Sequence, residues 1–198
     1  MHMLHSLLLA SLAYITAVSG VPTWERFSSR SSISSLVPIA SAIEAKGLPY
    51  NEPYYLAANA PTGVPGNASV TRVPQPADAP LFFINHNRLY QYTNDSYIFT
   101  VNVLNTTAVP GEPMPYKLVL SDKPEGLENP VWRWRGTSLH FDYGQKTNLG
   151  LLFACFNKDG KEGVYLWFDP APTPEACTIF TPHSFNALES QGLQTPLT

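Results

Sequence analysis

The sequence predicts a single all-β domain, an antiparallel β-sandwich or barrel, preceded by a short N-terminal extension. Short runs rich in β-branched and aromatic residues recur between Leu81 and Phe168, and turn-forming Gly, Asn, Asp and Pro separate them at nearly regular spacing. Charged residues make up only 14% of the chain, whereas aromatic residues make up 12% and 19 residues are proline. This composition is typical of extracellular β proteins. A β-trefoil-like arrangement is the alternative.

The length of 198 residues fits one domain better than two. We expect four regions along the chain. They are a signal peptide over 1–20, a flexible Ser-rich lead-in over 21–35, a single β-rich domain over 36–190 and a C-terminal tail over 191–198.

The first twenty residues follow the pattern of a secretory signal peptide. Leu7 to Val18 is an apolar run of about a dozen residues, which is right for the hydrophobic region of a leader but too short to span a bilayer. The small residues of Val18-Ser19-Gly20 predict cleavage before Val21. His2 and His5 stand where a leader usually carries Lys or Arg. We therefore expect a secreted, extracellular protein that is not held in a membrane after cleavage.

The expected strands begin at Leu81, after an extended Pro-rich loop over 57–80. Only Ile39 to Lys46 tolerates a helix, and a strand remains possible there. The strands predicted from composition and turn signals are 81–84, 88–93, 97–104, 116–120, 131–135, 138–143, 149–156 and 164–168.

Two segments that each contain a pair of predicted strands are similar in sequence. Pro80 to Tyr90 (PLFFINHNRLY) aligns without gaps with Pro130 to His140 (PVWRWRGTSLH), fifty residues later. A period of this size suits a trefoil or a duplicated hairpin. Two copies do not establish a repeat, so the sequence leaves sandwich, barrel and trefoil open.

Modification chemistry follows from the secretory route. Cys155 and Cys177 are an even pair that should form a disulfide in an oxidising compartment. The closed loop should contribute about 3 kcal/mol of stability in the chain-entropy model. Three sequons, at Asn67, Asn94 and Asn105, are candidate N-glycosylation sites.

Several partner classes are disfavoured by charge and composition. The net charge is −3 and no basic stripe is present, so nucleic acid is not an expected partner. His86, His140 and His183 lack the spacing of a metal site. We expect no metal, no cofactor and no catalytic residues in the leading interpretation.

Two pairs of side chains, each containing at least one carboxylate, favour the rival interpretation, a small secreted hydrolase. His140 and Asp142 share a strand face by alternation and could form a base with its orienting group. Asp142 and Asp169 both follow strands and could form the acid pair of a glycosidase. A surface hydrogen-bonded pair on a strand explains His140 and Asp142 more simply.

Tryptophans are the candidate ligand-binding residues. Trp132 and Trp134 share one strand face, and Trp167 lies on a later strand. Flat exposed rings stack on sugars, so these side chains could form a glycan-binding platform. Tryptophan at period two is more often part of a β-sandwich core.

A set of short motifs runs along the chain in this order: Pro38-Ile39, Glu52-Pro53-Tyr54-Tyr55-Leu56, Leu81 to Tyr92, Ser138-Leu139-His140-Phe141, Leu152-Phe153-Ala154-Cys155, Val164-Tyr165-Leu166-Trp167 and Cys177. In these motifs the chain resembles a group of small secreted proteins of filamentous fungi that includes phialide-associated cell-wall proteins and IgE-binding, allergen-like proteins.

The chain departs from this group in two ways. Phe156 stands where the group has proline after the first closing cysteine, and a second cysteine pair found in some relatives is absent. The resemblance implies secretion, cell-wall association and no established catalysis. The leading expectation is thus a non-enzymatic extracellular protein whose partner is cell-wall polysaccharide or a host surface. A secreted effector or allergen-like protein with a host protein partner is a further alternative.

Overall fold

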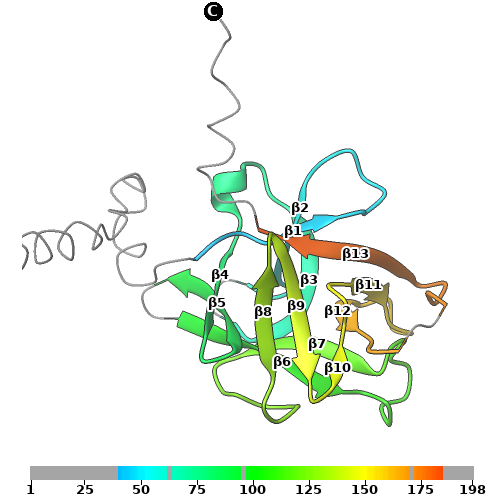
Figure 1. Ribbon diagram of the computed structural model, residues 1–198. Coiled ribbons are helices and arrows are strands. Elements are labelled where there is room, and N and C mark those ends of the chain that lie inside the picture. The colour runs from blue at the N-terminus through cyan, green and yellow to red at the C-terminus, as the bar shows by residue number, and fades with distance from the viewer. Residues whose placement is uncertain (1–39, 62–63, 95–96, 170–171, 185–198) are drawn as a thin grey trace, which may run out of the picture. The chain divides into compact units, whose positions relative to one another are not determined.

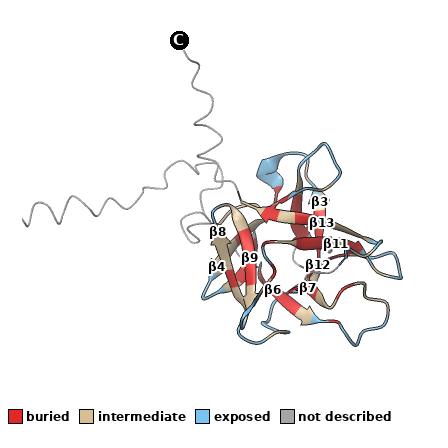
Figure 2. Cartoon of the chain, turned by 45° about the vertical axis from the view of Figure 1, so that its right-hand side comes forward, coloured by how far each residue is buried: buried red, intermediate tan, exposed pale blue. Residues whose placement is uncertain are grey.

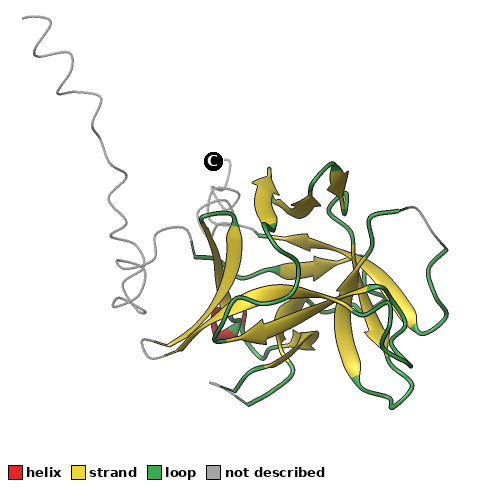
Figure 3. Ribbon diagram, turned by 90° about the horizontal axis from the view of Figure 1, so that it is seen from below, coloured by secondary structure: helices red, strands yellow, loops and turns green. Residues whose placement is uncertain are grey.

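A computed structural model describes residues 40–61, 64–94, 97–169 and 172–184. The predicted signal peptide, lead-in and tail lie outside these residues. The all-β prediction is confirmed, because the described residues form antiparallel strands and one short 3-10 turn, Pro76–Asp78 (Figures 1 and 3). The strands are β1 Glu44–Lys46, β2 Tyr54–Ala58, β3 Gly66–Arg72, β4 Leu81–Asn85, β5 Arg88–Asn94, β6 Tyr97–Asn105, β7 Tyr116–Ser121, β8 Val131–Arg135, β9 Ser138–Tyr143, β10 Lys146–Thr147, β11 Leu152–Phe156, β12 Glu162–Leu166 and β13 Cys177–His183.

Strand pairing closes into a ring. β7 pairs with β3, and the ladder continues through β2, β1, β13, β11 and β12 before it returns to β7. The two partners share one edge of β7, since β12 meets Tyr116 and Lys117 while β3 meets Val119 and Leu120. Closure of this kind leaves no free edge along the ring and makes the sheet a barrel.

Three equivalent hairpins can be recognised in this sheet, and one of them contributes its strands to the ring. β4 with β5 and β8 with β9 are hairpins in sequence, while β13 with β1 joins the two ends of the domain. Each hairpin receives the same backbone hydrogen bond from its neighbour at 2.8 Å. These bonds run from Trp132 N to Asn87 O, from Ser184 N to Thr137 O and from Phe82 N to Ser41 O. The domain is therefore a β-trefoil-like barrel of three units.

The three units are defined by these equivalences. The first contains β3 to β6, the second β7 to β11, and the third β12, β13, β1 and β2. The two similar sequence segments, Pro80–Tyr90 and Pro130–His140, correspond to two of the three hairpins. The third hairpin is divided between the two ends of the domain, so no third copy can be read continuously from the sequence.

The core is built in layers of equivalent residues. Leu89, Leu139 and Ile43 occupy the same position in the three hairpins, and all three are 0% exposed. The barrel strands add a second layer, and Figure 2 shows the buried residues running along the strands while the connections are exposed. This layer contains Ala68, Leu118 and Val164, also 0% exposed. Burial of an aliphatic side chain contributes about 1.5–3 kcal/mol, so these layers carry much of the stability.

The structure corrects the prediction of a loop over 57–80. This segment contains the end of β2 and all of β3, whose Ala68 and Val70 face the core. Prolines 65 and 74 flank β3 instead of interrupting it, so its ladder keeps every donor. The described part of the predicted segment 39–46, which begins at residue 40, contains the strand β1 and no helix. The sequence analysis did not predict β13.

We predict that Leu139→Ala lowers the free energy of unfolding by about 2–5 kcal/mol, because it removes a fully buried side chain from a three-residue layer. The matched control is Leu149→Ala, whose side chain is 61% exposed and should change stability by no more than about 0.5 kcal/mol. Urea unfolding of both variants measures the difference. Equal losses would contradict the layered core.

Candidate functional site

Trp132 belongs to the core. It is 1% exposed and packs on Phe141 with ring centroids 4.7 Å apart. Its indole Nε1 is buried and finds no hydrogen-bond partner among the described residues. Trp132 therefore offers no ring face to a sugar.

The other two tryptophans do not complete a platform. Trp134 shares the face of Trp132 and packs, partly buried, against the main core. Trp167 is also partly buried, but it packs against a separate apolar cluster outside the barrel. The structure thus divides the three candidate residues between two clusters, and they form no shared exposed surface.

His140 and Asp142 lie on one face of β9, as alternation predicts, but they do not form a base and its orienting carboxylate. Asp142 accepts a hydrogen bond from Nε of Arg133 on β8. His140 is buried, and its Nδ1 has no hydrogen-bond partner among the described residues. Burial, followed by the charges of Arg135 and Arg133, lowers the pKa of His140.

Asp142 and Asp169 are held by different basic side chains. Asp142 accepts a hydrogen bond from Arg133 on β8, whereas Asp169 contacts Nζ of Lys146 at 3.4 Å. These contacts do not pair the two carboxylates with one another, as a glycosidase acid pair requires.

The two cysteines lie at disulfide distance, as predicted. Cys155 on β11 and Cys177 on β13 are register partners with Cα atoms 4.1 Å apart, and their sulfur atoms are 2.04 Å apart. The pair contributes to the apolar cluster outside the barrel, together with Met114, Phe153 and Tyr165.

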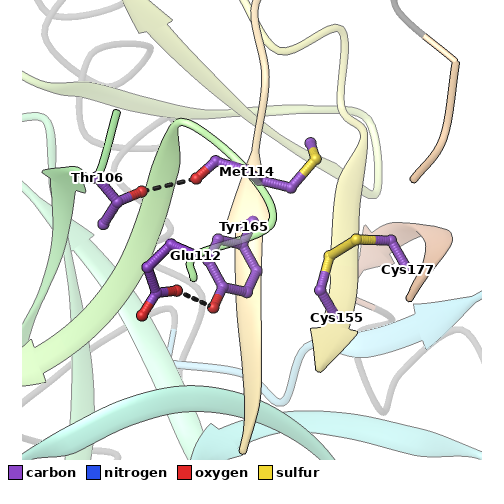
Figure 4. The surroundings of a disulfide bond; sticks show 6 residues. All are labelled: Thr106, Glu112, Met114, Cys155, Tyr165 and Cys177. Carbon is purple, nitrogen blue, oxygen red and sulfur yellow. Dashed lines mark hydrogen bonds between the residues drawn. A yellow bond between two sulfur atoms is a disulfide. The ribbon is translucent and has the colours of Figure 1, made fainter. Parts of the chain in front are cut away.

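A group of polar side chains ties the β6–β7 connection to β12 beside this disulfide (Figure 4). Tyr165 donates its hydroxyl to Oε2 of Glu112, and Nζ of Lys117 contacts Oε1 of the same carboxylate at 2.8 Å. The hydroxyl of Thr106 donates to the carbonyl of Met114 at 2.7 Å. We call Glu112, Lys117 and Tyr165 the Glu112 clamp, and its place beside Met114 and the disulfide makes it a structural element.

The sequons differ in their surroundings. Asn105 is exposed at the end of β6, whereas Asn67 is half-buried within β3. Asn94 ends β5, and the Asp95 and Ser96 of its sequon lie outside the described residues.

A hollow with exposed aromatic and polar side chains lies in the third unit. It has a volume of about 270 Å³ and is lined by residues of Glu44–Pro53, between β1 and β2. Tyr50 is 56% exposed and stacks on Tyr54, with ring centroids 4.5 Å apart and an interplanar angle of 26°. Tyr54 and Leu48 pack against the main core and support the exposed ring. We call this site the Tyr50 hollow.

The polar groups of the Tyr50 hollow carry both signs of charge. Glu44 forms an ion pair with Lys46, and Glu52 forms one with Arg72 on β3, each with an N–O distance of 2.5 Å. Asn51 adds an exposed amide to the lining. Carboxylates accept hydrogen bonds, ammonium groups donate them and an amide does both, so these groups match a neutral polyhydroxyl ligand.

The Tyr50 hollow lies where the third unit departs from the other two. In the first unit the hairpin ladder continues through Asn94 and Tyr97, and in the second through Tyr143 and Lys146. The equivalent segment of the third unit, Gly47–Pro53, forms no ladder.

Proline explains the open connection. Pro49 and Pro53 have no N–H to donate, so a hairpin ladder through this segment would lose two hydrogen bonds. Gly47 has φ of 95°, a turn conformation that glycine adopts without strain. Sequence reasoning missed the site because it searched for tryptophan, but the two prolines around Tyr50 were a usable signal.

We predict that Glu112→Gln makes stability less dependent on acid pH. Burial alone would raise the pKa of Glu112, but hydrogen bonds from Lys117 and Tyr165 and the charge of Lys117 lower it overall. Because its pKa is lower in the folded state, the ionised Glu112 stabilises the fold at pH values above the ordinary pKa of 4.5. This stabilisation is lost as the pH falls through the folded-state pKa.

The measurement is urea unfolding at pH 7 and at pH 3.5. The free energy of unfolding of wild type should exceed that of Glu112→Gln at pH 7, and this difference should be smaller at pH 3.5. Glu52→Gln, which removes an exposed ion pair, is the control and should behave like wild type. A gap between wild type and Glu112→Gln that is equal at both pH values would refute the role of the clamp.

Among the described residues, no group of His, Cys, Asp and Glu side chains is arranged to hold a metal ion. No helix in the described part of the chain has the length and apolar character needed to cross a bilayer. In comparisons with known proteins, no family model, no curated protein and no solved structure matches the chain. The resemblance to fungal cell-wall proteins therefore stays a prediction.

Proposed function

We propose that this chain is an exported extracellular protein that binds polysaccharide and catalyses no reaction, with a fungal cell wall as its place of action. The observation that carries the proposal is the Tyr50 hollow, where an exposed ring rests on a core-anchored partner beside groups that donate and accept hydrogen bonds. The leader pattern and the disulfide-distance cysteines support export.

Stacking on Tyr50 suits a sugar ring. The face of an aromatic ring is electron-rich, and the C–H groups on one side of a pyranose carry partial positive charge, so the two attract. One face of Tyr50 rests on Tyr54, and its 56% exposure leaves area for a ligand. The stacked partner holds the ring in place before binding, which reduces the ordering cost of association.

The charge balance favours a neutral glycan over a phosphate or an acidic ligand. Glu44 and Glu52 are balanced by Lys46 and Arg72, so the rim carries no excess of positive charge. Sugar hydroxyls can donate to the carboxylates and accept from the cations. The arrangement of the two hydrolase candidates, Asp142 held by Arg133 and Asp169 beside Lys146, supports a binding role over a catalytic one.

We predict that Tyr50→Ala weakens retention on insoluble β-glucan or chitin about tenfold, because it removes the stacking ring. The matched control is Phe156→Ala, which removes a ring of the same 56% exposure from another part of the surface. Co-sedimentation of the purified mature protein with each polysaccharide gives the retained fraction.

Retention that falls for Tyr50→Ala and not for Phe156→Ala supports the proposal. Equal retention of wild type and Tyr50→Ala would exclude the hollow as the binding site. Loss of retention in both variants to the same degree would indicate non-specific adsorption through exposed rings.

A further inference from the structure

The three sequons have structural surroundings that separate them as modification sites. An N-linked glycan needs an asparagine whose Nδ2 is accessible and a folded surface with room for a bulky sugar. Asn105 and Asn67 can be compared directly, because their sequons are fully described.

The Asn105 sequon is ordered and faces solvent. Its Oδ1 accepts hydrogen bonds from the backbone N–H of Thr107 at 3.0 Å and from the Thr107 hydroxyl at 2.7 Å. A backbone N–H can only donate, so the atom it meets must be the amide oxygen. Neither bond uses Nδ2, the atom that would receive the sugar. Asn105 and Thr107 are both exposed.

The middle residue holds this sequon in place. Thr106 is buried, its backbone N–H donates to the carbonyl of Pro115 at 2.8 Å, and its hydroxyl donates to Met114. Thr106 thus anchors the sequon to the end of the β6–β7 connection, while the side chains of Asn105 and Thr107 remain exposed to solvent. A glycan on Asn105 would extend into solvent without displacing a packed side chain.

Asn67 has the opposite surroundings. It is a register partner of Val119, and its carbonyl accepts a hydrogen bond from Asn59 at 2.7 Å. The next two residues of its sequon, Ala68 and Ser69, are 0% and 5% exposed.

Asn67 also lies in a paired part of the sheet. β3 pairs with β7 at Gly66 and Asn67, and the strand as a whole also contacts β12. Packing is tight at the preceding residue, because a Cβ on Gly66 would lie 2.9 Å from the Cβ of Ala60. A glycan on half-buried Asn67 therefore has less room than one on exposed Asn105.

From these contrasts we propose that Asn105 carries an N-linked glycan and that Asn67 stays unmodified. This inference rests on the proposed export, because the transfer takes place in the secretory lumen. The donor is a lipid-linked oligosaccharide diphosphate. A bond forms between Nδ2 and the anomeric carbon, the bond from that carbon to the diphosphate breaks, and the amide proton passes to a base of the transferase. The lipid diphosphate leaves.

The glycan would stand away from the Tyr50 hollow. Asn105 ends β6, whereas the hollow precedes the start of β2, and these two strands are equivalent in the three-unit barrel. The two sites therefore lie towards opposite ends of the barrel wall, as Figure 1 shows for the β1–β2 and β6–β7 connections. Asn105→Gln should leave polysaccharide retention unchanged.

The test expresses the full mature chain behind a strong heterologous leader in a eukaryotic secretory host. The purified protein is treated with peptide-N-glycosidase in ¹⁸O-labelled water, which converts each glycosylated Asn to labelled Asp, and mass spectrometry locates the label. We expect label at Asn105 and none at Asn67. Asn105→Gln and Thr107→Ala, which remove the Asn105 sequon, should abolish the label at residue 105, whereas Thr107→Ser should retain it. Ser69→Ala, which removes the Asn67 sequon, should leave the total mass of attached sugar unchanged.

Two results would overturn the inference, namely exported protein without label at Asn105 and protein labelled at Asn67. Failure of the native leader to export the chain would instead defeat the proposed extracellular function. Because the heterologous leader supplies entry to the lumen, the two failures are distinguishable.

Discussion

Packing of three equivalent units around one apolar interior is the constraint on which the rest of the structure depends. Each unit supplies one residue to each layer, so Leu89, Leu139 and Ile43 complete one another. No unit can bury its apolar face alone, and the pairing of β13 with β1 completes the third unit. The ring of strands closes as a consequence, and the connections at its ends remain free to differ.

The proposed binding site lies where the third unit differs from the other two, whereas the core keeps the threefold pattern. The core uses Trp132 as the counterpart of Phe82 in the first unit, and this removes it from any ligand surface. The hairpins of the first two units continue into paired strands, whereas Gly47–Pro53 opens into the Tyr50 hollow. The Glu112 clamp has a different role, since it ties the β6–β7 connection to β12 beside the apolar cluster that contains the disulfide.

Local patterns predicted the parts of this fold that local chemistry determines. The runs at 131–135 and 138–143 became β8 and β9 with the predicted bounds, because alternation and a Gly136 turn specify a hairpin without further contacts. β3 was missed because its small Ala68 and Val70 are recognisable as core residues only beside the other units. The position of Trp132 was not fixed by its pattern, since period-two tryptophan is more often core but also fits a binding platform. Tyr50 was overlooked because its stacking on Tyr54 depends on an unpaired connection.

The central claim is that the open connection between β1 and β2, Gly47–Pro53, is the binding surface. Titration of the ¹⁵N-labelled protein with soluble β-glucan and chitin oligosaccharides, followed by amide chemical shifts, tests this most directly. The account predicts saturable shifts for one of these ligands, concentrated in residues 44–53 and in Arg72 on the neighbouring strand. Shifts centred on β8 and β9, or no saturable shifts with either ligand, would contradict it.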